Sequence, residues 1–192
     1  MNDFAFYFDL GWKHIISANA LDHQLFILAL SAVYLLENWK QVLVLVTAFT
    51  IGHSLTLALS TYDVIRVSNS WVEFLIPLTI VITALLNFSR KDFTAKSLRL
   101  NYFLALFFGL IHGLGFANTI RFMLAKKQLI ALPLFSFNVG LEVGQIIVVA
   151  LILFISFLLV NKAGLQRKWW VWGISTLAII IAANICIDRW PL

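Results

Sequence analysis

The 192-residue chain is poor in charge: Asp, Glu, Lys and Arg together make up only 12% of it. Soluble domains carry about 25% charged residues, so this chain has roughly half of what a water-facing surface needs. Hydrophobic residues make up 61%, and the mean hydropathy is +0.93. The composition excludes a soluble enzyme domain, a disordered chain and a fibrous repeat. It predicts an integral membrane protein.

Cysteine is almost absent, since Cys186 is the one cysteine in the chain. A single cysteine excludes an internal disulfide and any metal site built from a cysteine cluster. If the chain binds a metal, the ligand atoms must therefore be nitrogen and oxygen.

The apolar segments are continuous runs and not the ten-residue alternations of a porin-type barrel. A helix needs about 20 apolar residues to cross a membrane. The runs predict an all-α integral membrane protein, with one transmembrane domain over residues 1–192 and about six transmembrane helices. The predicted spans are residues 21–36, 41–60, 71–88, 100–119, part of 129–160, and 169–187.

Residues 4–20 are apolar and aromatic, but Asp9, Lys13 and His14 interrupt them. This segment predicts an N-terminal lead-in helix that lies at the membrane interface or is half inserted.

The run over residues 129–160 is too long for one upright helix. Pro133 and the pair Gly140 and Gly144 lie in its first half. We therefore predict a separate lead-in over residues 129–137, re-entrant or surface-lying, before the true span begins.

Basic residues orient membrane proteins, because lysine and arginine accumulate in cytoplasmic loops. Six lie in loops on the side of the N-terminus and eight on the other side. The difference predicts a multi-pass protein of the bacterial inner (plasma) membrane with both termini in the periplasm. It also assigns the net charge of +5 to these loops and not to nucleic-acid binding.

The ionisable residues in the spans are the most informative feature, because charged groups inside a bilayer are costly and face a cavity, a partner or an ion. Asp22, His23 and Glu73 begin spans that run away from the N-terminal side. His53 and His112 each lie about 12 residues into spans that run back, so each has risen about 18 Å through a core of about 30 Å. All five fall in one half of the bilayer, which favours one shared polar site.

The candidate metal ligands come from several spans and include every histidine of the chain. They are His14, Asp22, His23, His53, His112 and Glu142. Residues predicted to support them are Glu73, Ser54, Asn138 and Gln145. Neutral imidazoles with carboxylates suit a divalent transition metal (Ni²⁺, Co²⁺, Zn²⁺ or Fe²⁺) and not Cu⁺.

Other interpretations of these residues stay open. A proton relay would use the same groups. The histidines can also be hydrogen-bonded across helices, and the glycine pairs can serve tight packing alone.

Several stretches together resemble the HupE/UreJ family of hydrogenase and urease accessory membrane proteins. They are residues 11–15, 22–26, 47–59, 72–73, 108–117 and 137–145. The resemblance implies a small bacterial inner-membrane permease that moves nickel or cobalt toward metalloenzyme assembly. It also implies that His14, Asp22 and His23 match the first histidine–aspartate motif of the family and His112 the second.

Two departures place the chain closer to a divergent branch of that family. Seven residues separate His14 from Asp22, which is more than is usual there. The second motif has one histidine, His112, where the family pattern has two.

The leading hypothesis is therefore a permease, and not an enzyme, for a divalent transition metal (nickel or cobalt), with its site in the outer leaflet half. Beyond the lipid bilayer, its expected partners are those of metalloenzyme maturation. One alternative is a membrane-embedded, metal-dependent hydrolase that uses the same cluster, with Glu73 or Glu142 as general base. Another is a non-catalytic scaffold subunit.

Overall fold

The computed structural model describes residues 3–18, 20–90, 99–124 and 130–191, and these residues form helices and no strand. The seven α-helices are α1 (Asp3–Ile16), α2 (Leu21–Ser31), α3 (Trp39–Thr61), α4 (Asn69–Phe88), α5 (Arg99–Leu124), α6 (Ala131–Ser156) and α7 (Arg167–Asp188). A short 3₁₀ turn, η1 (Leu36–Asn38), precedes α3, and a π-helical turn, η2 (Phe157–Lys162), extends α6.

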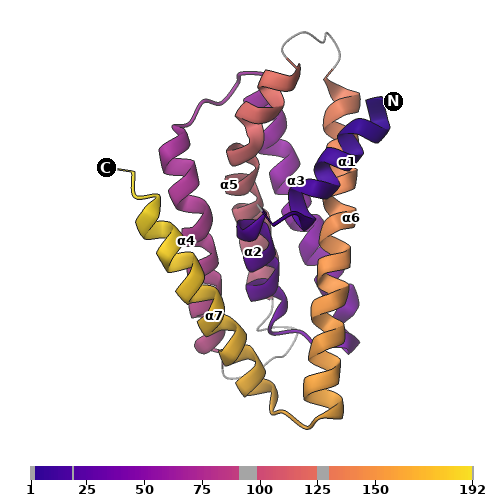
Figure 1. The fold of residues 1–192 in the computed structure, drawn as a ribbon, viewed down its shortest axis with the longest axis vertical. Helices are drawn as coiled ribbons and strands as arrows, with labels where there is room; N and C mark the ends of the chain where they lie inside the picture. Colours follow the sequence, from indigo (N-terminus) through magenta and orange to yellow (C-terminus); the bar gives the residue numbers. More distant parts are fainter. Residues whose placement is uncertain (1–2, 19, 91–98, 125–129, 192) are drawn as a thin grey trace.

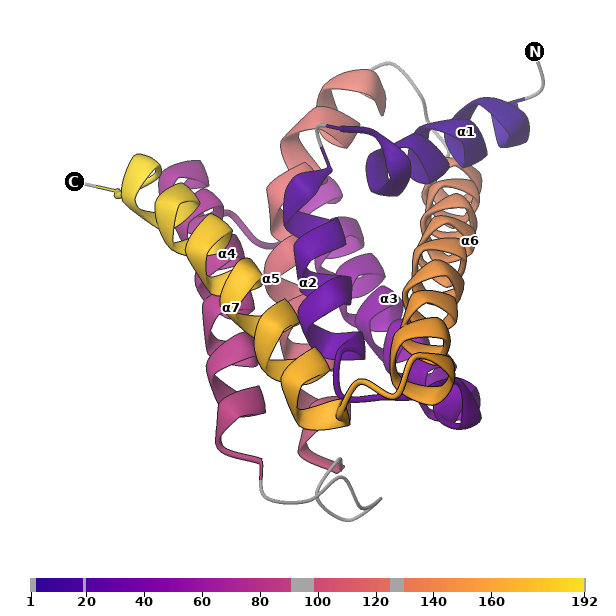
Figure 2. The same ribbon diagram turned by 60° about the horizontal axis from the view of Figure 1, so that its bottom comes forward.

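The long helices form a bundle, and both termini lie toward the same end of it (Figure 1). Figure 2 shows α4 and α7 side by side on one flank, α1 and α6 on the other, and α2 between them. The closest pairs are α3 with α5, α1 with α6, and α4 with α7. The short helix α2 is therefore enclosed by longer ones.

In the part of the chain that the structure describes, five helices are long and apolar enough to cross a membrane, which agrees with the predicted helical membrane protein. The predicted first span, residues 21–36, differs. Helix α2 has 11 residues and ends at Ser31, so it is only about 16 Å long, roughly half of the hydrocarbon thickness. The expectation of six full-length spans is thus not confirmed.

Helix α2 can end inside the protein because side chains of other elements donate hydrogen bonds to carbonyl oxygens in and just after its last turn. The Asn87 amide donates to the Ala29 carbonyl oxygen at 2.8 Å, and the Arg167 guanidinium donates to that of Val33. Irregular backbone at membrane depth is tolerated where protein buries it in this way.

The prediction of a separate lead-in over residues 129–137 is wrong for residues 130–137; Leu129 lies outside the described residues. Helix α6 begins at Ala131 and continues without a break into η2. Pro133 lies in the first turn, where backbone N–H groups have no intrahelical partner, so proline costs no hydrogen bond there. The expected N-terminal lead-in forms α1, and its depth in the membrane stays a prediction.

Glycine allows α3 and α5 to touch through their backbones. A Cβ atom at Gly109 would overlap the carbonyl oxygen of Phe49, and one at Gly113 would overlap that of His53. Gly11 and Gly140 give α1 and α6 the same close approach. Small residues serve this role in membrane helix pairs, because they remove the side chains that would hold the helices apart.

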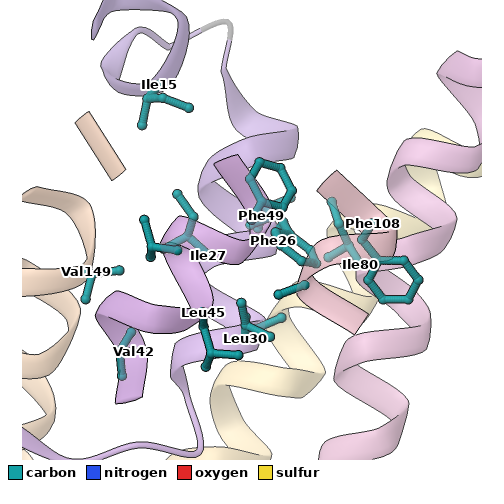
Figure 3. Close-up of a cluster of buried hydrophobic side chains, with 14 of the residues drawn as sticks. Ile15, Phe26, Ile27, Leu30, Val42, Leu45, Phe49, Ile80, Phe108 and Val149 are labelled. Carbon is teal, nitrogen blue, oxygen red and sulfur yellow. The ribbon is translucent and has the colours of Figure 1, made fainter. Parts of the chain in front are cut away.

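Apolar side chains from α2, α3, α4 and α5 fill the centre of the bundle. Figure 3 shows Phe26, Phe49 and Phe108 grouped with Ile80, and Leu30 near Leu45. The rings of Phe26 and Phe49 lie 5.0 Å apart between centroids. The core therefore surrounds α2 instead of lying on one side of it.

We expect Gly109→Ala to destabilise the protein, because the new methyl group would force α3 away from α5. Overpacking of this kind costs about 1–3 kcal/mol. The matched control is Gly173→Ala in α7, where an added Cβ meets nothing within 4 Å. Apparent melting temperatures in detergent should fall for Gly109→Ala and stay equal or rise for Gly173→Ala. Equal melting temperatures for the two variants would contradict the assigned backbone contact.

Candidate metal centre

The break between α1 and α2 positions the first two histidines. The Gln24 amide donates to the carbonyl oxygens of Ile15 and Ser17, both at 3.0 Å, and so ties the end of α1 to the start of α2. His14 lies in the last turn of α1 and His23 in the first turn of α2. Their ring centroids are 4.6 Å apart.

The long helices α3 and α5 supply the other two histidines. The ring of His53 lies 6.1 Å from that of His14 and 5.9 Å from that of His23. The ring of His112 lies 5.0 Å from that of His23. All four histidines of the chain thus lie together, although four different helices carry them.

Three of the four lie close enough together that they could hold a metal ion. His14, His23 and His53 can each offer one ring nitrogen such that the three atoms lie within 4.8 Å of one another. His53 is 0% exposed and His23 is 6% exposed. His112 is also buried, at 1%, but stands beside this group of three and not within it.

Five ring nitrogens of the four histidines are buried and make no hydrogen bond of normal geometry with the described residues. These atoms are Nε2 of His14 and His23, both ring nitrogens of His53, and Nδ1 of His112. A buried polar atom without a partner costs about 1–3 kcal/mol, and such atoms are rare in native proteins. For His53, the Asn138 side chain of α6 interacts with the ring, so the alternative of a hydrogen bond across helices stays open for this pair.

A pocket of about 310 Å³ leads to the cluster from the end where α2 and α4 begin. His14, His23 and His112 line it together with Asp22 and Glu73. The cluster therefore adjoins an open, polar chamber.

One of the two acidic residues in this pocket is already paired. Asp22 accepts a charged hydrogen bond of 2.8 Å from Arg189, which follows α7 and also lines the pocket. From the sequence, Arg189 is expected only to be one of the basic loop residues that orient the protein. Nothing near it in the sequence indicates that it contacts Asp22.

Aromatic rings enclose the histidines on their other sides. The Phe116 ring lies 4.2 Å from that of His14, and it stacks on Phe137 at 4.9 Å. The Phe49 ring lies 5.1 Å from that of His112. The sequence analysis did not identify these aromatic side chains as part of the site. Phe49 and Phe116 each lie one helical turn from a histidine, His53 and His112.

The structure places Glu142 and Gln145 against a different part of α3. Thr47 donates to the Glu142 carboxylate at 2.7 Å, and Thr50 donates to the Gln145 side-chain oxygen at 2.9 Å. Thr47 lies nearly two turns before His53. Glu142 is not in the group of three nitrogen ligands.

Two further predicted supporting residues bond to their own helices. The Ser54 hydroxyl donates to the Thr50 carbonyl oxygen, and the Asn138 amide donates to that of Leu134. The Asn138 side chain also interacts with the His53 ring, as expected of a supporting residue, although its buried oxygen makes no hydrogen bond of normal geometry with the described residues.

Comparison with known proteins gives one match. A family model described as HupE / UreJ protein matches residues 1–189. The chain belongs to the HupE/UreJ family. No curated protein and no solved structure matches it. The histidine cluster is thus a feature of a HupE/UreJ chain.

We expect His53→Leu to leave the metal-free protein as stable as the wild type or more so, because neither buried ring nitrogen of His53 makes a hydrogen bond of normal geometry with the described residues. Asn87→Leu is the contrasting variant, since it removes hydrogen bonds to the Ala29 carbonyl and to the Ser175 hydroxyl. It should cost about 1–3 kcal/mol. Thermal unfolding in chelator would show the difference. A larger loss for His53→Leu would mean that His53 has a structural role.

Proposed function

We propose that the chain is a permease of the bacterial inner membrane for a divalent transition metal, nickel or cobalt. The observation that carries the proposal is the set of three mutually close ring nitrogens from His14, His23 and His53. The HupE/UreJ family is linked to transport of nickel and cobalt or to accessory roles with these metals.

The donor set favours these metals on chemical grounds. Imidazole nitrogen is a borderline ligand that suits Ni²⁺, Co²⁺ and Zn²⁺, whereas Mg²⁺ and Ca²⁺ prefer oxygen. Three ring nitrogens leave coordination positions open, which a transported ion needs in order to leave again. The metal is here the substrate, and His14, His23 and His53 are its proposed ligands.

The pocket supplies an entrance. Asp22 and Glu73 give it negative charge, which raises the local concentration of cations. His14, His23 and His112 line the same pocket, whereas the fully buried His53 does not. We infer that an ion meets the carboxylates first and His53 last, and that Arg189 limits the charge that Asp22 presents.

The hydrolase alternative has weaker support. It needs a carboxylate beside a metal-bound water. Glu142 hydrogen-bonds to Thr47, and Asp22 pairs with Arg189. Glu73 lines the pocket and is the one of these three for which no partner is described here.

Metal binding and uptake test the proposal together. Purified wild-type protein should bind Ni²⁺ or Co²⁺, and vesicles that contain it should accumulate the radiolabelled ion. His23→Ala and His53→Ala should each lose at least 10-fold in affinity and most of the uptake, since each removes a ligand. The matched control is Thr61→Val, also buried on α3, whose hydroxyl bonds only within its own helix.

Each other outcome is informative. Bound metal without accumulation in vesicles would overturn transport and favour the embedded hydrolase or a scaffold with a structural metal. Wild-type protein that binds neither ion would overturn the metal site itself.

We further propose that both termini face the periplasm. In a Cys186→Ser background, Val64→Cys between α3 and α4 should react with a membrane-impermeant maleimide in intact spheroplasts. Lys168→Cys at the start of α7 should react only after permeabilisation. Val64 precedes the start of α4, and Lys168 lies at the start of α7. Because α4 and α7 pack side by side in opposite directions, the two positions lie at opposite ends of the bundle. The reverse labelling pattern would invert the orientation.

A further inference from the structure

His112 differs from the other histidines because its two ring nitrogens have unlike surroundings. Nε2 lies 3.1 Å from the Thr79 hydroxyl oxygen of α4. Nδ1 is buried and has no hydrogen-bond partner among the described residues. The sequence analysis did not single out Thr79.

The direction of this hydrogen bond follows from the proton count of the hydroxyl. The Thr79 oxygen lies 2.7 Å from the carbonyl oxygen of Ile76, which can only accept. Threonine hydroxyls in helices commonly donate to a carbonyl three or four residues earlier. Because the single hydroxyl proton is used there, the Thr79 oxygen can only accept from His112, and Nε2 must carry the proton.

A neutral imidazole has one N–H, so a proton on Nε2 leaves a lone pair on Nδ1. The contact is well held, because Thr79 is 2% exposed and His112 is 1% exposed. The ring of His112 also packs 5.0 Å from that of His23, one of the three proposed ligands. The lone pair thus lies on a ring that borders the proposed metal site.

We propose that Thr79 is a positioning residue that holds His112 as the Nε2–H tautomer, so that Nδ1 is a fourth nitrogen donor for the divalent metal. The metal part rests on the proposed function, whereas the tautomer does not. Partners that fix the tautomer of a histidine ligand typically contribute 10–100-fold to metal affinity. Thr79 thus acts on the metal through His112 and does not touch it.

The tautomer is measured first, in metal-free protein. Long-range ¹H–¹⁵N spectra of protein labelled at histidine nitrogen, in detergent with chelator, distinguish the two neutral tautomers, and the His112→Gln spectrum assigns the signals. Wild type and Thr79→Ser should show His112 as the Nε2–H form. Thr79→Val, which keeps shape but removes the oxygen, should shift His112 toward the Nδ1–H form. A wild-type Nδ1–H form, or an unchanged Thr79→Val spectrum, would overturn the proposal.

Cobalt affinity of the same proteins tests the metal part. Thr79→Val should weaken Co²⁺ binding about 10-fold, and Thr79→Ser should restore it. The matched control is Thr83→Val, one turn further along α4, whose hydroxyl donates to the Thr79 carbonyl oxygen and not to a histidine. Equal Co²⁺ affinity in wild type and Thr79→Val would refute the role of Nδ1. Failure of the wild type to bind Co²⁺ would instead refute the proposed function and leave the tautomer assignment standing.

Discussion

The backbone contact between α3 and α5 is the constraint on which the candidate site depends. Gly109 and Gly113 meet the carbonyl groups of Phe49 and His53, and His112 stands between the two glycines on α5. The contact that joins the helices therefore also sets His53 and His112 at one level of the membrane. A side chain at either glycine would separate the two helices and, with them, the two histidines.

Helices α1 and α2 complete the cluster by a different principle. Gly11 and Gly140 seat α1 on α6 and place His14 at its end, while the half-length helix α2 carries His23. A membrane helix of 11 residues exposes backbone groups that a full span would pair. Protein side chains bond to these groups at one end of α2, and the other end adjoins the polar pocket. The chain uses its irregular backbone at the point where its ionisable side chains meet.

Sequence alone predicted the helical membrane class from run length, and the rise per residue led to the expectation that histidines from several helices lie together, as they do. It missed the end of α2, because the next residues, 32–35, are as apolar as the helix before them. That end depends on Asn87 and Arg167, which are distant in the sequence. Depth gives the level of a residue but not its direction around the helix, and so Glu142 was grouped with the histidines although it bonds to Thr47. The prediction of a break at Pro133 failed because proline interrupts a helix only beyond its first turn. The sequence alone does not show that α6 begins two residues earlier, at Ala131.

The buried ring nitrogens without a hydrogen-bond partner determine which kind of ligand the site can bind. If the histidines served only to join helices, each imidazole would be hydrogen-bonded, as the Asn87 amide is to the Ala29 carbonyl oxygen and the Ser175 hydroxyl. Around His53 the described structure places the rings of Phe49 and Phe137, which cannot satisfy a ring nitrogen, and the Asn138 side chain as a polar neighbour. The stability lost there is offset by the glycine contacts and by the apolar core around α2. Stability given up locally and recovered by the surrounding packing is characteristic of functional sites. A cation with a preference for nitrogen is the ligand that several converging lone pairs in a dry cavity bind most strongly, and this links the packing of the bundle to the proposed transport of a metal.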